Sequence, residues 1–181
     1  MRPIKIPPIA LLMAVLGLIS GLICTYAPEI VMEFKLFDTP VFQGIIFGAV
    51  IGIGHLRWGK GGLAGFVIIL IFTTMAWIAA VNGFNIISDD AKNYLYPAAL
   101  SAGVIGATGT WIGAALANAI FRKLKLLMPV VIIGAMAGLL VVLEVDSSND
   151  DFLVLFVVWQ SAVAFCFGLA LNNSLEQNTI L

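Results

Sequence analysis

The sequence predicts an all-α integral membrane protein, with six transmembrane helices packed through glycine-rich faces into a single domain of residues 1–181. Hydrophobic residues make up 61% of the chain and charged residues only 10%, whereas a soluble globular domain carries about 25% charged residues. Six segments are apolar enough to cross a bilayer, and the basic residues between them gather on one side of it. These three observations predict the fold class and leave no room for a separate soluble module.

The six predicted spans are residues 9–26, 39–56, 61–81, 97–120, 126–143 and 152–171. A hydrocarbon core about 30 Å thick requires about 20 apolar residues of helix. None of the six segments contains Asp, Glu, Lys or Arg, and a single charge at the centre of such a helix costs about 2.5 kcal/mol or more. The segments also lack the polar and apolar alternation of β-barrel strands. We therefore expect helices.

The basic residues predict the orientation. Six crossings place seven of the nine on one side, namely Arg2, Lys5, Arg57, Lys60, Arg122, Lys123 and Lys125, and leave Lys35 and Lys92 on the other. An excess of Lys and Arg marks the cytoplasmic side. The second span is the shortest, but without it the basic residues would fall on both sides. We expect both termini in the cytoplasm and the helices in the cytoplasmic (inner) membrane of a bacterium.

The acidic residues show the complementary distribution and predict an acidic outer face. Its members include Glu29, Glu33, Asp89, Asp90, Asp146, Asp150 and Asp151. Such a cluster of carboxylates raises the local concentration of cations. The segment from Asp146 to Asp151 lacks the glycine and the distant glutamate of an EF-hand loop. We therefore expect no metal site and no cofactor.

The first outer loop, residues 27–40, carries apolar residues at helical spacing: Ile30, Val31, Phe34 and Phe37. This spacing predicts a short amphipathic helix lying in the membrane interface. Such a helix is either a lid over an outward-facing cavity or a passive connector.

Glycines four positions apart predict close helix contacts, because small residues on one face allow two backbones to approach. The pairs and series include Gly44, Gly48 and Gly52, then Gly109 with Gly113, and Gly134 with Gly138. Their partner is either another helix of the same chain or a second protein, and the series in the second span could also wall a narrow path.

Two amides and two indoles within the spans are the candidate ligand-binding residues. Asn118 and Gln160 need a partner on another helix or a water-lined cavity, because an amide in hydrocarbon is costly to leave unpaired. Trp111 and Trp159 could wall an aromatic pocket. The structural alternative is that both amides join helices and both indoles pack in the core or face lipid. The only histidine, His55, has no acidic neighbour at its depth and is expected to be an interfacial anchor.

These residues predict binding rather than catalysis. No nucleophile and base, and no metal-ligand cluster, share one depth, so an intramembrane enzyme acting on lipid is the least favoured of the three functions considered. No basic tract suits nucleic acid. The lipid bilayer is the expected partner. The sequence favours binding or passive translocation of a small neutral or cationic solute, alone or as a subunit of a larger transporter. The alternative is a structural or accessory subunit of a membrane complex or homo-oligomer, without transport activity.

In helix number, size and the cytoplasmic placement of both termini, the chain resembles the substrate-binding subunits of energy-coupling-factor vitamin transporters. Gly44 to Gly65 is similar to the glycine-rich second and third helices of that family. The resemblance is one of topology and carries no diagnostic residue. It implies a bound vitamin and a partner ATPase module.

Overall fold

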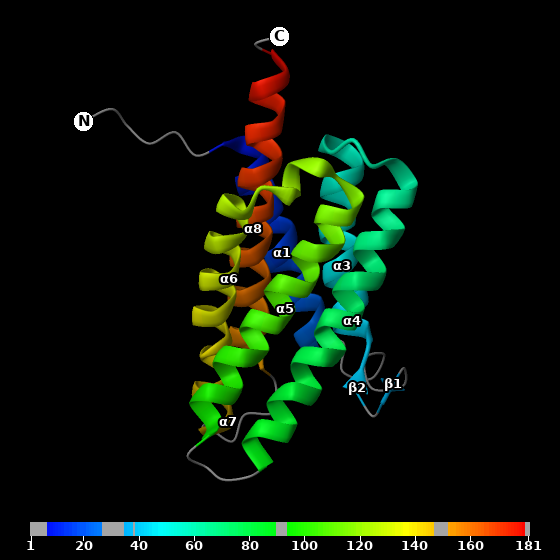
Figure 1. Cartoon of the computed structure of the whole chain (residues 1–181). Helices are drawn as coiled ribbons and strands as arrows, with labels where there is room; N and C mark the ends of the chain where they lie inside the picture. The colour runs from blue at the N-terminus through cyan, green and yellow to red at the C-terminus, as the bar shows by residue number, and fades with distance from the viewer. Residues whose placement is uncertain (1–6, 27–34, 38, 90–93, 147–151, 180–181) are drawn as a thin grey trace, which may run out of the picture.

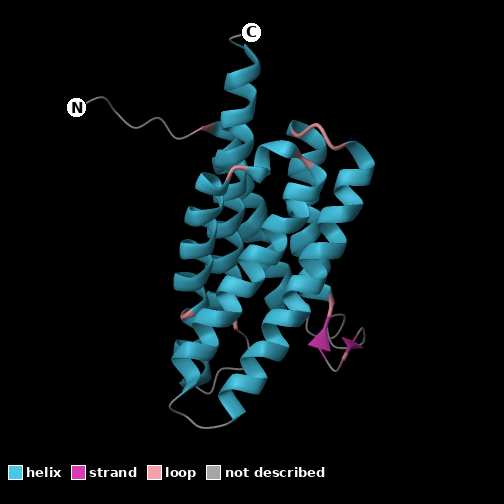
Figure 2. Ribbon diagram, in the orientation of Figure 1, coloured by secondary structure: helices cyan, strands magenta, loops and turns pink. Residues whose placement is uncertain are grey.

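The computed structural model describes residues 7–26, 35–37, 39–89, 94–146 and 152–179. The chain forms an all-α bundle with one small two-stranded sheet (Figures 1 and 2). In chain order the elements are α1 (Pro8–Tyr26), β1 (Lys35–Leu36), β2 (Thr39–Pro40), α3 (Phe42–Trp58), α4 (Gly62–Asp89), α5 (Leu95–Ala117), the 3-10 helix η2 (Ala119–Arg122), α6 (Leu124–Gly138), α7 (Leu140–Asp146) and α8 (Leu153–Thr179).

The long helices form a closed ring in which neighbours run antiparallel. Going round the ring, α1 packs on α3, α3 on α4, α4 on α5, α5 on α6, and α6 on α8, which returns to α1. The start of α1, the end of α8 and the connections α3–α4 and α5–α6 lie together at one end, which we call the terminal end (Figure 1). The β1–β2 hairpin, the end of α4 and the start of α8 lie at the opposite end, the hairpin end.

Five helical segments are long and apolar enough to cross a membrane, which supports a multi-pass integral membrane protein. They are Pro8–Tyr26, Gly62–Ser88, Leu95–Ala117, Leu124–Val145 and Leu153–Asn173. At 17 residues, α3 is shorter than these. Apolar side chains such as Leu18, Ile71 and Ile132 are exposed on the outside of the ring, as expected where lipid is the solvent.

Several helices begin or end at residues other than the limits of the predicted spans, by up to eight residues. The second helix begins at Phe42 and not at residue 39, because Thr39 and Pro40 pair with β1. The fourth ends at Ala117 and not at residue 120, because Asn118 is extended and its side chain accepts a hydrogen bond from the Ile120 N–H at 3.1 Å. The third and sixth helices run on to Asp89 and Thr179, and the fifth is interrupted at Leu139.

The part of the first outer loop that the structure describes is a hairpin and not a helix. Residues 27–34 lie outside the described residues. Phe37 occupies the turn with φ of 51°, a left-handed conformation that no α-helix continues, so the predicted helix does not extend through Phe37. The hairpin is fastened to α4, since the Trp77 indole N–H donates to the Pro40 carbonyl at 2.7 Å and Asn82 donates to the Thr39 hydroxyl at 2.8 Å.

The spaced glycines lie where helices of this chain meet. A Cβ on Gly44, Gly48 or Gly52 would contact α4, and one on Gly109 or Gly113 would also contact α4. On α6, Gly134 and Gly138 face α5, and on α1, Gly17 and Gly21 face the backbone of α8. At all of these positions but Gly48, the added Cβ would come closer than 3.0 Å to an atom of the neighbouring helix, so the glycines allow the helices to pack closely.

Three aromatic side chains pack against one another in the half of the bundle nearer the terminal end. The ring centroids of Trp111 and Phe121 are 4.9 Å apart, those of Trp111 and Phe167 5.4 Å, and those of Phe121 and Phe167 5.5 Å. All three side chains are buried, with Met13 and Leu171 in the same cluster. We call this triad the aromatic plug.

We expect Glu144→Ala to destabilise the hairpin end. The Glu144 carboxylate is buried and accepts hydrogen bonds from the backbone N–H groups of Val154 and Leu155, at 2.5 and 3.1 Å, in the first turn of α8. Loss of such a cap costs about 1–2 kcal/mol. Thermal unfolding in detergent should show a lower midpoint for Glu144→Ala and an intermediate one for Glu144→Gln, which keeps one acceptor oxygen. An unchanged midpoint for Glu144→Ala would contradict this role.

Candidate ligand-binding site

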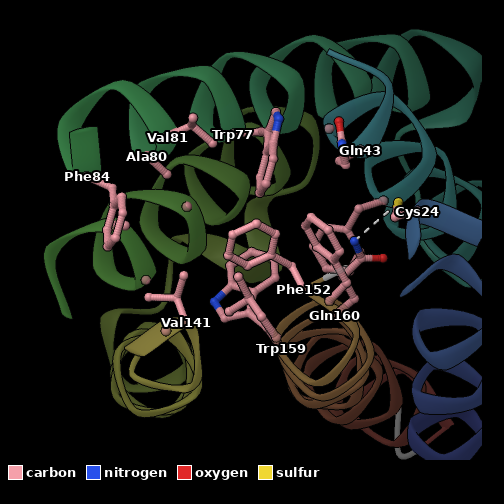
Figure 3. A pocket seen from close by; sticks show the side chains of 18 of the residues that line it. Cys24, Gln43, Trp77, Ala80, Val81, Phe84, Val141, Phe152, Trp159 and Gln160 are labelled. Carbon is pink, nitrogen blue, oxygen red and sulfur yellow. Dashed lines mark hydrogen bonds between the residues drawn. The ribbon is translucent and has the colours of Figure 1, made fainter. Parts of the chain in front are cut away.

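A cavity of about 380 Å³ occupies the half of the bundle nearer the hairpin end. This volume lies in the range of small-molecule sites, about 300–1,000 Å³. Every long helix contributes to its wall (Figure 3). The lining residues include Cys24 and Thr25 of α1, Gln43 and Phe47 of α3, Thr73, Trp77 and Phe84 of α4, Gly103 and Gly106 of α5, Gly138 of α6, Val141 of α7, Phe152 just before α8, and Phe156, Trp159 and Gln160 of α8.

The wall of this cavity is mainly apolar and uncharged. Six aromatic rings line it, while its polar groups are amides, hydroxyls and one thiol. None of the described residues that line it is Asp, Glu, Lys or Arg. An ion placed there would lose its hydration without gaining a counter-charge, which costs several kcal/mol. The chemistry of the wall therefore suits a neutral molecule.

Hydrogen bonds and ring contacts hold the two indoles of the wall in place. The Trp159 N–H donates to the Gly134 carbonyl at 3.1 Å, and its ring lies 5.2 Å from that of Phe47. The Trp77 ring lies 5.6 Å from that of Phe156, and its N–H is held by β2 as described above. Fixed rings present flat apolar faces to a ligand at little cost in side-chain entropy.

Gln160 lines the cavity but already has partners. Its side chain is only 2% exposed, its Oε1 accepts a hydrogen bond from the Ser20 hydroxyl, and its Nε2 lies 3.6 Å from the Cys24 sulfur. These contacts join α8 to α1. Gln160 is thus both a wall residue and an interhelical link, the two roles that its sequence position suggested as alternatives.

Among the described wall residues, Gln43 and Thr73 have buried polar atoms that lack partners. Their side chains are 7% and 2% exposed, and neither the Gln43 Oε1 nor the Thr73 hydroxyl oxygen has a hydrogen-bond partner. Neither residue is among the candidates predicted from the sequence. Gln43 lies within a predicted span, so it is an amide in hydrocarbon just as Gln160 is.

The other predicted site residues lie elsewhere or outside the described residues. Trp111 belongs to the aromatic plug and Asn118 caps η2, and neither lines the cavity. Of the outer acidic face, Asp89 and Asp146 are the last residues of α4 and α7. The remaining members, Glu29, Glu33, Asp90, Asp150 and Asp151, lie outside the described residues.

His55 is buried, so its predicted role as an interfacial anchor is wrong. Its side chain is 1% exposed near the terminal end, and a Cβ on Gly65 would lie 3.1 Å from its Nε2. Glycines at the α3–α4 turn leave the space that the imidazole fills. Within the described part of the chain, no three His, Cys, Asp or Glu side chains gather as a metal site would require.

Comparison of the chain with protein-family models, with curated proteins and with solved structures finds no match.

Proposed function

We propose that this protein crosses the cytoplasmic membrane of a bacterium six times, with both termini inside, and binds a small neutral molecule in the cavity at its outer half. The observation that carries the proposal is a cavity of about 380 Å³ with six aromatic rings and no charged side chain among its described lining residues. Apolar walls with a few placed polar groups are typical of small-molecule sites.

The position of α3 in the ring supports a sixth crossing. It packs between α1 and α4, and it exposes Ile45, Ile53 and Leu56 on the outside as its neighbours expose their own apolar residues. Its 17 residues reach about 25 Å at 1.5 Å per residue. A helix slightly shorter than the hydrocarbon core is accommodated by local thinning of the bilayer.

The basic residues of the two turns support the orientation. Arg57 and Lys60 flank the α3–α4 turn, and Arg122, Lys123 and Lys125 flank the α5–α6 turn. Both turns lie at the terminal end (Figure 1). The positive-inside rule assigns that end to the cytoplasm, so the cavity faces the outer half of the membrane.

The uncharged wall favours a neutral ligand over a cationic one, and the aromatic plug favours binding over free passage. Trp111, Phe121 and Phe167 fill the bundle between the cavity and the terminal end. Translocation would require these rings to move, on their own or through a partner subunit. The alternative, a structural subunit, was based on glycine faces that could bind a second protein. Helices of the same chain already occupy these faces, which supports that alternative less.

The proposal is tested by filling the cavity. Ala102 lines it, whereas Leu100 on the same helix is exposed on the outside. In nanodiscs, equilibrium dialysis should show saturable binding of the neutral probe 2-naphthol, and Ala102→Phe should weaken that binding at least about tenfold, or about 1.4 kcal/mol. Leu100→Phe should leave it unchanged, and the charged probe 2-naphthoate should not bind.

Equal uptake of 2-naphthol by protein-free nanodiscs, or equal binding by Ala102→Phe and the wild type, would overturn the proposal.

A further inference from the structure

We propose that Gln43 and Thr73 determine the specificity of the cavity, and that its ligand is a neutral, largely apolar ring compound bearing an O–H or N–H donor. This inference rests on the proposed binding function and names the class of molecule bound.

Gln43 and Thr73 both line the cavity where α3 crosses α4. Gln43 is adjacent to Gly44, and a Cβ added to Gly44 would lie 2.8 Å from the Thr74 Cα. A Cβ added to Gly48 would lie 3.2 Å from the Thr73 Cβ. The glycine face of α3 thus brings these two positions of α3 and α4 to one side of the cavity. The glycines that allow α3 and α4 to pack closely therefore also determine how far apart Gln43 and Thr73 lie.

Thr73 differs from other hydroxyls of the bundle. Thr25, Thr74 and Thr110 each donate to the backbone carbonyl four residues earlier, at 2.8–3.0 Å, as is usual for a hydroxyl within a helix. The Thr73 hydroxyl makes no such bond and has no other partner. The wall of the cavity thus contains a buried hydroxyl whose hydrogen-bonding capacity is unused.

The unpaired Gln43 Oε1 requires a partner that donates a hydrogen bond. An amide oxygen only accepts hydrogen bonds, so it requires a donor, whereas a threonine hydroxyl both donates and accepts. A buried polar atom left unpaired costs about 1–3 kcal/mol. A ligand O–H or N–H removes that cost, and the ring faces of Trp77 and Phe156 cover its apolar body.

The inference is tested with 2-naphthol and 2-methoxynaphthalene, which differ in that the ether has no donor. After correction for partitioning into protein-free nanodiscs, we expect the wild type to bind 2-naphthol about 3- to 10-fold more tightly, as one hydrogen bond predicts. Gln43→Met keeps the side-chain length and should reduce this preference to less than about twofold, while affinity for the ether is unchanged. Thr73→Val should reduce it partly.

Thr74→Val is the matched control, because that neighbouring hydroxyl is already bonded to the Leu70 carbonyl and does not line the cavity. It should retain the preference for 2-naphthol. If both probes bind the wild type equally and Ala102→Phe weakens the binding of both, then the cavity binds these molecules but the inference of a ligand donor is wrong. If neither probe responds to Ala102→Phe, the binding function itself is wrong.

Discussion

Alanine in place of Gly103 is expected to destabilise the bundle by about 3 kcal/mol, at the upper end of the usual range for overpacking. The added Cβ would lie 3.0 Å from the Ala135 Cα and closer still to the Gly134 carbonyl oxygen. These are backbone atoms of α6, which cannot rotate away as a side chain does. Conversely, a Cβ on Gly138 of α6 would lie 3.0 Å from the Gly103 Cα of α5. Neither α5 nor α6 therefore has room to shift.

Gly83→Ala on α4 is the matched control. A Cβ there would meet only the Ile105 Cδ1, at 3.4 Å, an ordinary van der Waals distance. Thermal unfolding in detergent should show a large loss of stability for Gly103→Ala and little change for Gly83→Ala. Equal midpoints for the two variants would mean that α5 and α6 do not pack as closely as described.

Trp111→Ala is expected to destabilise the protein by about 3–5 kcal/mol, the range for removal of a large buried aromatic side chain. The Trp111 ring contacts those of both Phe121 and Phe167, so its loss leaves a void at the centre of the aromatic plug. That void extends the cavity toward the terminal end. Leakage of erythritol, a small neutral solute that lipid vesicles retain, should therefore increase in proteoliposomes that contain the folded variant.

Trp111→Phe keeps an aromatic ring at this position and should lose no more than about half as much stability, without added leakage. Wild-type stability for Trp111→Ala would show that the plug does not depend on this ring.

The membrane character of the chain could be predicted because it depends on composition alone. Uncharged segments of about 20 residues have few folds available in lipid other than helices. The helix ends were less predictable, because they depend on single residues. Asn118 falls at the end of an apolar run that suggests a continuing helix, yet its side chain accepts a backbone hydrogen bond and starts a 3-10 turn.

The cavity could be predicted only in part, because which side chains line it depends on which helices are neighbours. Trp111 and Trp159 have similar surroundings in sequence, but one lies in the plug and the other in the cavity wall. A spacing of four places glycines on one face without identifying the helix they meet. Likewise, Gln43 and Gln160 differ only in their partners, and partners are a property of the tertiary structure.

The contact between α1 and α8 has a consequence for how the protein is made. The Ser20 hydroxyl bonds to Gln160, 140 residues later in the chain. At about 5–20 residues per second, the ribosome takes about 7 to 28 s to synthesise that interval. Throughout it, the small-residue face of α1, including Gly17 and Gly21, has no native partner on α8. The ring closes only when α8 has been made, so α1 must be sheltered by lipid or by the insertion machinery until then.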